Sequence, residues 1–325
     1  MALRVFLFGF LFCFCSFGFT LNVTKVGSLP KYLGTGEKSR TELSGMIEAN
    51  GLLVGVDDSS HPKAPLGVYL FKLVSGQPLL LQHVPLDPIH QDLEGITKVN
   101  NSLWVTTSIS KKNIEGSRLS EIRLVQENAG KFYGKVVRSI NPKKSILAAL
   151  KSINSKWYDR IESLSAKQGG LNVEALSVAQ SPGRILIGLR SPLYDPEFGI
   201  KGKLDKGKAI VLEAELLQSD IEVKKIYLLN LKGHGVRGME YIPRLKQHMV
   251  IGGSIPKLKD FNLFTWSESK EPIPITMPAF NKLCRPETVF PVKVSGKDHI
   301  MIASEDSGKY CVSQPFSYIL VEIKP

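Results

Sequence analysis

The feature that most constrains this chain is a pattern that recurs five times: a polar residue opens a pair of apolar, strand-forming stretches, and a small or charged cluster closes it. A repeat of tens of residues built from short strands is typical of a β-propeller. We therefore predict an all-β propeller fold. The five stretches run from Ser44 to Ser59, Glu94 to Ser108, Glu174 to Ser191, Arg237 to Ser254 and Glu287 to Ser307.

The strand signals also indicate how the ring closes. Stretches rich in strand formers and bounded by Gly, Pro, Asn or Asp fall into groups of four, except that the last group has three before Pro325. Leu21 to Gly27 is strand-like and has no partner nearby in the sequence. As the outer strand of the last blade it would cover an exposed edge. We predict five blades closed by the N-terminal strand, or six if one group hides a further pair of strands.

One segment has helical rather than strand periodicity. Apolar residues recur there every three or four positions, at Ile146, Leu150, Ile153, Trp157, Ile161 and Leu164. Asn141 is a suitable N-cap, Pro142 suits the first turn, and Gly169 with Gly170 can end a helix. The sequence predicts a helical insertion over 141–168, within a single propeller domain over 19–325.

The N-terminus predicts export. Arg4 precedes an apolar run from Val5 to Phe14, and Ser16 and Gly18 supply small residues at alternate positions, as in a cleaved signal peptide over 1–18. An uncleaved membrane anchor is the alternative, but a spanning helix needs about 20 apolar residues. We expect a secreted or periplasmic monomer without a transmembrane segment after cleavage.

Two of the four cysteines, Cys13 and Cys15, would leave with the signal peptide. Cys284 and Cys311 remain, and they flank a predicted hairpin. An oxidising compartment permits a disulfide between them, whereas the alternative is a pair of packed free thiols. Sequons at Asn22 and Asn100 leave glycosylation open.

The formal charge of +12 comes from basic residues scattered through the chain. Scatter of this kind is typical of a solvated surface and suits anionic partners. Because no arginine-rich run or aromatic-basic interleaving occurs in the sequence, we predict no nucleic-acid partner.

The repeats also predict where a site would lie. In a blade, the start of the first strand and the end of the second lie on the same face, because the two strands are antiparallel. The recurring polar residues would therefore gather at one mouth of the central channel, and a ring of carboxylates with two arginines is a candidate site. The set is Ser44, Asp57, Asp58, Glu94, Ser108, Glu174, Arg190, Arg237, Ser254, Glu287, Glu305 and Asp306.

Each member has a chemical and a structural interpretation. Glu94, Glu174 and Glu287 could serve as general bases or hold a cation, or they could hold neighbouring blades together. Arg190 and Arg237 could bind a planar anion, or be satisfied by these carboxylates. Ser108 and Ser254 would add ligand contacts at the mouth.

Two further predictions concern the same face. His234 could act as an acid or base, or be a solvated turn residue. Asp57, Asp58, Glu305 and Asp306 could bind calcium, the cofactor we expect if there is one. Glycines such as Gly95 and Gly238 are expected to permit close strand approach rather than to bind phosphate.

Several motifs resemble those of the family called domain of unknown function 3616, from about Leu43 onward. They are Asp92 to Ile96, Asn172 to Leu176, Ile187 to Leu193, Gly235 to Glu240 and Ser304 to Gly308. The resemblance implies an exported propeller-like protein without an assigned activity. The element around Glu94 is more distantly similar to one in esterase-like phytases and related secreted propellers, from which Ala175, Arg237 and Ser44 depart.

Together these features predict an exported propeller that binds a small anionic or polyhydroxylated ligand at the mouth. An enzymatic version would be a metal-assisted hydrolase of phosphate or carboxylic esters. The alternative is a non-catalytic propeller that engages a protein or an envelope polymer. The sequence leaves open whether the protein is an enzyme.

Overall fold

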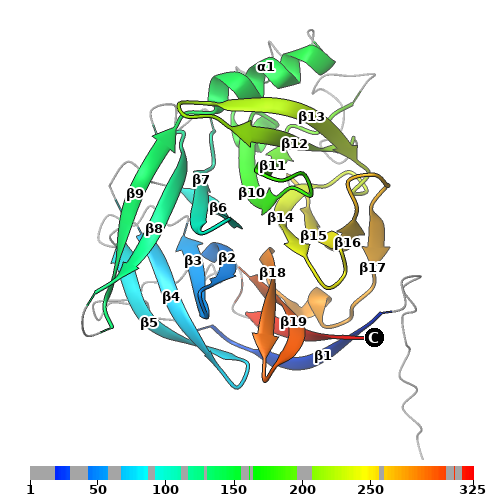
Figure 1. Ribbon diagram of the computed structural model, residues 1–325. Helices are drawn as coiled ribbons and strands as arrows, with labels where there is room; N and C mark the ends of the chain where they lie inside the picture. The colour runs from blue at the N-terminus through cyan, green and yellow to red at the C-terminus, as the bar shows by residue number, and fades with distance from the viewer. Residues whose placement is uncertain are drawn as a thin grey trace, which may run out of the picture.

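The computed structural model describes residues 19–29, 43–57, 67–86, 92–110, 116–127, 130–154, 161, 164–195, 207–255, 260–304, 311 and 317–325. Within them, five four-stranded antiparallel sheets surround one centre (Figure 1). The predicted five-bladed β-propeller is confirmed, and a sixth blade is not present in these ranges. The predicted signal peptide over 1–18 lies outside the described residues.

Each blade is named here by its order in the chain. Blade 1 holds β2 (Leu43–Ala49), β3 (Leu52–Asp57), β4 (Gly67–Val74) and β5 (Gln77–Pro85); blade 2 holds β6 (Leu93–Val99), β7 (Ser102–Thr107), β8 (Leu119–Gln126) and β9 (Phe132–Ile140). Blade 3 holds β10 (Asn172–Val178), β11 (Arg184–Ser191), β12 (Ala209–Leu216) and β13 (Ile221–Leu229). Blade 4 holds β14 (Gly235–Ile242), β15 (Gln247–Gly253), β16 (Phe261–Trp266) and β17 (Ile273–Ile275).

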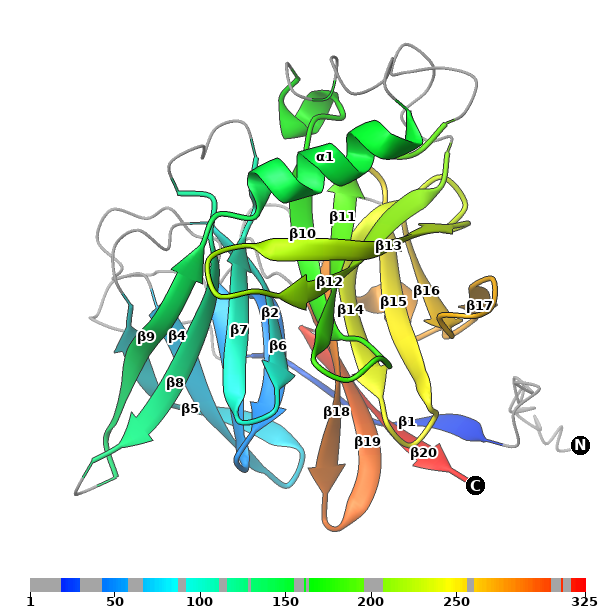
Figure 2. The ribbon, with the colours of Figure 1, turned by 45° about the horizontal axis from the view of Figure 1, so that its top comes forward.

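Blade 5 is built from both ends of the chain. Its sheet runs β18 (Pro286–Val294), β19 (Lys297–Ser304), β20 (Tyr318–Lys324) and then β1 (Thr20–Gly27). β1 lies antiparallel to β20, as Figure 2 shows, with Leu21 opposite Ile323. The predicted closure by the N-terminal strand is therefore confirmed.

The blades are held together by apolar side chains between their faces. Between blades 5 and 1, for example, Phe71, Phe290 and Met301 belong to one buried cluster. Full burial of such a side chain contributes about 1.5–3 kcal/mol. The innermost strands β2, β6, β10, β14 and β18 are neighbours around the ring and surround the centre (Figure 1).

The helical insertion is present but shorter than predicted. α1 (Lys143–Ile153) begins after Pro142, and the side chain of Asn141 accepts the Lys143 backbone N–H at 3.1 Å. The helix ends because Asn154 has extended backbone dihedrals, and Asn favours such non-helical conformations. A short 3₁₀ helix, η2 (Ala166–Gln168), follows and ends at Gly169 in the left-handed region. A single continuous helix over 141–168 is thus wrong.

α1 packs on blade 3 through one face. Ile146 and Leu150 are fully buried in a cluster that includes Ile221 of β13. Figures 1 and 2 show the helix beside β13. The insertion therefore covers the rim of the propeller rather than its axis. A second short 3₁₀ helix, η3 (Phe280–Lys282), precedes β18.

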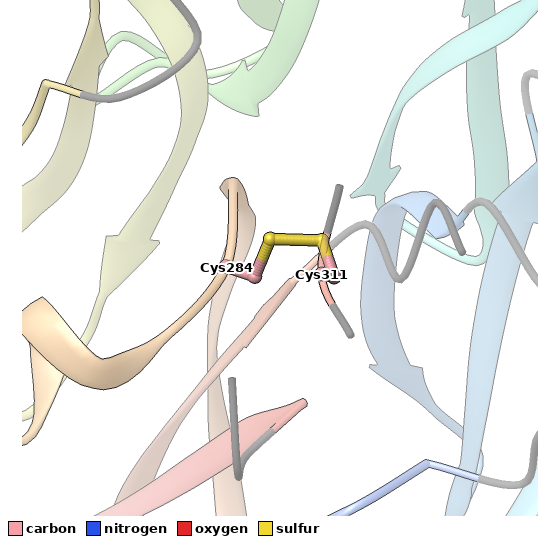
Figure 3. The surroundings of a disulfide bond; sticks show 2 residues. All are labelled: Cys284 and Cys311. Atoms are coloured by element: carbon pink, nitrogen blue, oxygen red, sulfur yellow. A yellow bond between two sulfur atoms is a disulfide. The ribbon is translucent and has the colours of Figure 1, made fainter. Parts of the chain in front are cut away.

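Cys284 and Cys311 form a disulfide bond. Cys284, just before β18, is joined to Cys311, between β19 and β20, with a Cα to Cα distance of 5.5 Å (Figure 3). The cross-link limits the conformations of the unfolded chain between two points 27 residues apart. It therefore fixes the segment that enters the inner strand of blade 5.

Among the described residues, no helix has the length and apolar character that a membrane span requires.

Candidate functional site

The five repeat residues occupy one equivalent position of the inner strands. In each blade the pairing with the second strand skips this residue; in blade 1, for example, Leu43 pairs with Asp57 and Gly45 with Val56. A β-bulge of this kind changes the direction in which the side chain of the skipped residue points. The residues are Ser44, Glu94, Glu174, Arg237 and Glu287, and all five are buried.

The next position along each inner strand is occupied by a small residue: Gly45, Gly95, Ala175, Gly238 and Thr288. A Cβ atom on Gly238 would lie 2.0 Å from the Glu287 carbonyl oxygen, so the backbones of blades 4 and 5 approach too closely for a larger residue. Thr288 instead uses its hydroxyl, which accepts the Met46 N–H at 2.8 Å. The expected role of Gly95 and Gly238 in close strand approach agrees with this packing.

Charged residues of the mouth form one cluster, which we call the acid–arginine cluster: Glu174, Arg190, Arg237 and Glu287. The Arg237 guanidinium contacts both the Glu174 and the Glu287 carboxylates. Arg190 Nη1 lies 2.7 Å from Glu174 Oε1. Asn172 Nδ2 donates to the same oxygen at 2.6 Å. Three blades are thereby linked through a buried ion-pair network.

The cluster controls the ionisation of Glu174. Burial alone would raise the pKa of this carboxyl, but the positive charges of Arg190 and Arg237 outweigh burial and lower it. Glu174 is therefore a carboxylate at neutral pH. Its burial together with its two cations suits a structural role, because an isolated buried charge would be strongly unfavourable.

The central cavity beside the cluster is small. It has a volume of about 10 Å³ and is lined by residues 44–46, 94–96, 174–176, 238–240 and 287–289 of the inner strands. That volume is about what one water molecule needs. The axis of the propeller therefore has no room for a small organic ligand at this level.

The other predicted mouth residues are spread around the same face. Ser108 follows β7 and its hydroxyl donates to the Asp92 carboxylate. The backbone N–H of Ser254, after β15, donates to the Asp260 carbonyl at 3.3 Å. Asp57, at the end of β3, is hydrogen-bonded to Tyr69. The structure thus places these three residues in separate blades rather than in one contact group.

The predicted metal ligands are only partly described. Asp58, Glu305 and Asp306 lie outside the described residues, which include Asp57 alone. Within the described part of the chain, no group of three or more His, Cys, Asp or Glu side chains is placed to hold a metal ion. The calcium site stays a prediction.

A larger cavity opens beside the mouth, between blades 4 and 5. This outer pocket has a volume of about 480 Å³. It is lined by Lys232, His234, Asp260, Phe261, Asn262, Phe280, Asn281, Leu283 and Pro286. Leu283 directly precedes Cys284 in the sequence, so the disulfide bond between Cys284 and Cys311, drawn in Figure 3, restrains one wall of the pocket.

His234 is the predicted site residue that faces this pocket. It follows Lys232 and Gly233, both with positive φ (59° and 83°), which turn the chain before β14. The side chain is 8% exposed, so the solvated-turn interpretation is wrong. Burial lowers the pKa of His234, and Asn262 Nδ2 lies 3.0 Å from its Nδ1. An amide N–H needs an acceptor, so the neutral imidazole carries its proton on Nε2.

One comparison decides the family. The model of the family described as "Protein of unknown function (DUF3616)" matches residues 116–299, which is more than half of the 325-residue chain. The chain belongs to the DUF3616 family. No curated protein matches this DUF3616 chain.

Solved structures similar to this DUF3616 chain include enzymes and an allergen. A putative oxidoreductase (glucose dehydrogenase) from Thermus thermophilus is 10% identical, with a TM-score of 0.46 over 94% of this chain and 100% of that one. RS223-β-xylosidase is 11% identical, with a TM-score of 0.47 over 87% and 93%. The allergen Mala s 1 of Malassezia sympodialis is 7% identical, with a TM-score of 0.48 over 87% and 93%. These comparisons do not show the distant resemblance to esterase-like phytases.

The sequence analysis missed a second polar layer of this DUF3616 protein. Thr97, Ser177 and Glu240 lie three positions after the repeat residue in blades 2, 3 and 4, and all three are buried. Blades 1 and 5 have Ile47 and Phe290 at that position. The sequence does carry a signal for this layer, because three of the five repeats have a polar residue at the same position. Glu240 also belongs to the motif from Gly235 to Glu240, in which only Arg237 was predicted as a site residue.

Proposed function

We propose that this protein is an exported propeller that binds a small polyhydroxylated ligand in the outer pocket. The observation that carries the proposal is the pocket itself, because its volume of about 480 Å³ suits a small organic molecule whereas the axial cavity does not. The pocket lies on the mouth face, next to the predicted site and displaced from the axis.

The lining supports a ligand with many hydroxyl groups. Asp260 offers carboxylate acceptors, Asn262 offers an amide, and Lys232 offers ammonium donors. Phe261 and Phe280 add apolar surface for the C–H groups of such a ligand. The mixture of acceptors and donors with aromatic rings favours a polyol or saccharide over a purely anionic ligand, since Lys232 is accompanied by Asp260.

The acid–arginine cluster supports a binding role over a hydrolytic one. Glu174 and Glu287 are each 3% exposed, and both contact Arg237. A general base must reach the proton that it removes. In our proposal the cluster joins the blades, and recognition is left to the neighbouring pocket.

The experiment is a binding screen by isothermal titration calorimetry with neutral monosaccharides, short oligosaccharides, polyols and sugar phosphates. We expect a neutral saccharide or polyol to bind, and Asn262→Leu with Asp260→Ala to weaken binding at least tenfold, or about 1.4 kcal/mol. Lys293→Ala, an exposed change at the far end of β18, is the matched control and should bind as the wild type does.

Three outcomes would count against the proposal: no binding by any member of the screen, binding unchanged in the pocket variant, or binding equally reduced in Lys293→Ala. A calcium-dependent rise in Tm with turnover of phosphate or carboxylic esters would favour the hydrolase instead, because a ligand of the folded state stabilises it.

A further inference from the structure

Glu240 joins three blades from a position beside the axis. Its Oε2 accepts the Thr97 hydroxyl of blade 2 at 2.9 Å, and its Oε1 lies 3.0 Å from the Ser177 Oγ of blade 3. The backbone N–H of Tyr241 in blade 4 donates to Oε1 at 2.8 Å. The carboxyl is therefore held by neutral partners, and Glu240 lines the small central cavity.

A chain of contacts leads from Glu240 outward, and we call it the Glu240 chain. Ser177 Oγ lies 3.3 Å from His248 Nδ1, and His248 Nε2 lies 3.1 Å from Glu268 Oε1. The His248 side chain is fully buried and that of Glu268 is 10% exposed. The chain therefore runs from the axis to a carboxylate that reaches the surface between blades 3 and 4.

Glu268 at the outer end is held as a carboxylate. Burial opposes its ionisation, but hydrogen bonds from His248 and from the Gln180 N–H, at 2.7 Å, outweigh burial and lower its pKa. Tyr227 OH also lies 3.2 Å from Glu268 Oε2. His248 must therefore present an N–H from Nε2 to this carboxylate.

The donors and acceptors of the Glu240 chain can be counted from that end. If the imidazole is neutral and Nε2 carries its proton, then Nδ1 accepts from the Ser177 hydroxyl. Because its hydrogen is then used for His248, Ser177 Oγ can only accept a hydrogen bond from Glu240. Glu240 must therefore be a protonated carboxyl group that donates this bond. If Ser177 donates to a Glu240 carboxylate instead, Nδ1 must donate to Ser177 and His248 is an imidazolium.

These two arrangements contain the same number of protons. They interconvert when Glu240 gives its proton to Ser177 Oγ while Ser177 gives its own proton to His248 Nδ1, so that Ser177 is unchanged. When the proton is lost altogether, one of the contacts at 3.0 and 3.3 Å brings two acceptors together. An unpaired buried polar contact of this kind is destabilising.

We propose that Glu240 and His248 share one proton through Ser177, and that this proton stabilises the hydrogen bonds that join blades 2, 3 and 4. The device is independent of ligand binding in the outer pocket. It makes the stability of the propeller respond to pH near neutrality.

The charged surroundings of Glu240 fit this assignment. Glu94, Glu174 and Glu287 line the same cavity from β6, β10 and β18, and the Arg237 cation of β14 contacts two of these carboxylates. Glu48 on β2 and Lys98 on β6 are half-buried, and each follows directly after the residue of its blade that is equivalent to Glu240. On the outer side, His248 and Glu268 face Ser177.

The sign of the pH effect follows from two shifts. Burial raises the pKa of Glu240 from 4.5 to about 7, and hydrogen bonds only partly oppose this. Burial also lowers the pKa of His248, so the shared proton resides mainly on Glu240. The unfolded chain keeps a proton on His248 up to about pH 6.5, the ordinary pKa of histidine, so the folded and unfolded states hold equal numbers of protons on this pair between about pH 4.5 and 6.5. Above pH 6.5 the folded protein still holds the shared proton that the unfolded chain has released, so this contribution to stability falls as pH rises through about 7.

The test is the Tm of the wild type and of Glu240→Gln from pH 5 to 8.5. We expect the Tm of the wild type to fall by about 1 °C between pH 6.5 and 8. The Tm of Glu240→Gln should not fall in this range, because the amide donates to Ser177 at every pH. Glu48→Gln, a matched change on β2 outside the chain, should keep the slope of the wild type. An unchanged slope in Glu240→Gln, or a lost slope in Glu48→Gln, would overturn the proposal.

A measurement on the unaltered protein decides the question if Glu240→Gln does not fold. Infrared difference spectra of the wild type should show a buried protonated carboxyl at pH 6 that disappears by pH 8.5. ¹⁵N spectra of the labelled histidines should show one ring at pH 6 with its proton on Nε2 and an acceptor Nδ1, changing with the same midpoint. The absence at pH 6 of both a buried protonated carboxyl and a buried imidazolium would contradict the shared proton.

Discussion

Two buried polar clusters of this propeller share the inner strands β10 and β14, and their carboxyl groups are stabilised in opposite states of ionisation. In the acid–arginine cluster, Arg237 and Arg190 lie against the carboxylates, and the pKa of Glu174 is lowered. In the Glu240 chain the partners of the carboxyl are neutral, and the pKa of Glu240 is raised to about 7. Three positions along β14 separate Arg237 from Glu240, so the distribution of cations, and not depth alone, decides whether a carboxylate is kept ionised.

The comparison also separates two kinds of pH response. Glu174 contributes stability that is present above its unfolded pKa near 4.5 and is lost as pH falls through its lower folded value. Glu240 contributes stability that is lost as pH rises toward 7. The propeller should therefore be most stable in mildly acidic solution.

The largest expected effect comes from removing the shared cation of the acid–arginine cluster. Arg237→Leu would leave two buried carboxylates without their common partner, and breaking a buried pair in this way costs about 3–5 kcal/mol. Urea unfolding at pH 7 measures the loss. Arg123→Leu, whose side chain is 60% exposed, is the control and should change stability by less than about 0.5 kcal/mol. A loss below about 1 kcal/mol in Arg237→Leu would show that the cluster does not hold the blades.

A smaller effect is expected from Glu174→Gln. The change keeps the shape of the side chain but removes the negative charge beside Arg190 and Arg237, and we expect a loss of about 2–3 kcal/mol at pH 7. Because the ionisable group is gone, the loss relative to the wild type should shrink as pH falls below 4. The unfolding free energies of both proteins from pH 3 to 7 check this. A pH-independent difference would mean that Glu174 is not the titrating group.

The smallest effect concerns one hydrogen bond of the Glu240 chain. Thr97→Val is nearly isosteric and removes the hydroxyl that donates to Glu240 Oε2, which costs about 1 kcal/mol. Since that bond favours the carboxylate, its loss should also raise the pKa of Glu240 and shift the fall in Tm to higher pH. Thr265→Val, a buried threonine of β16 outside the chain, is the control for the change of residue type. A shift to lower pH in Thr97→Val would contradict this role of the hydroxyl.

The fold followed from the sequence because its signals repeat. Each blade carries a polar residue and then a small residue at the same positions of its inner strand, so five weak signals support one another. The lone segment Leu21 to Gly27 had only one place to pair. The helix was harder to bound, because apolar spacing continues through Trp157 and Ile161 after the backbone has already become extended at Asn154.

The candidate site was predicted less completely. The sequence brought Glu174, Arg237 and Glu287 to one mouth, and the structure places them in contact. It could not show that the cavity beside them has room for about one water, since that depends on the radius of the ring. Nor could it pair Thr97 with Glu240, which are 143 positions apart and meet across the axis.

Pairing of β1 with β20 bears on how the protein is made. Thr24 and Leu320, which are hydrogen-bonded in blade 5, are separated by 296 positions, so the first strand of this propeller to be synthesised pairs only after the last one has been made. Until β20 has been made, blade 5 lacks the strand that joins β1 to β19. A synthesis product that stops before β20 would therefore expose unpaired strand edges, which promote aggregation.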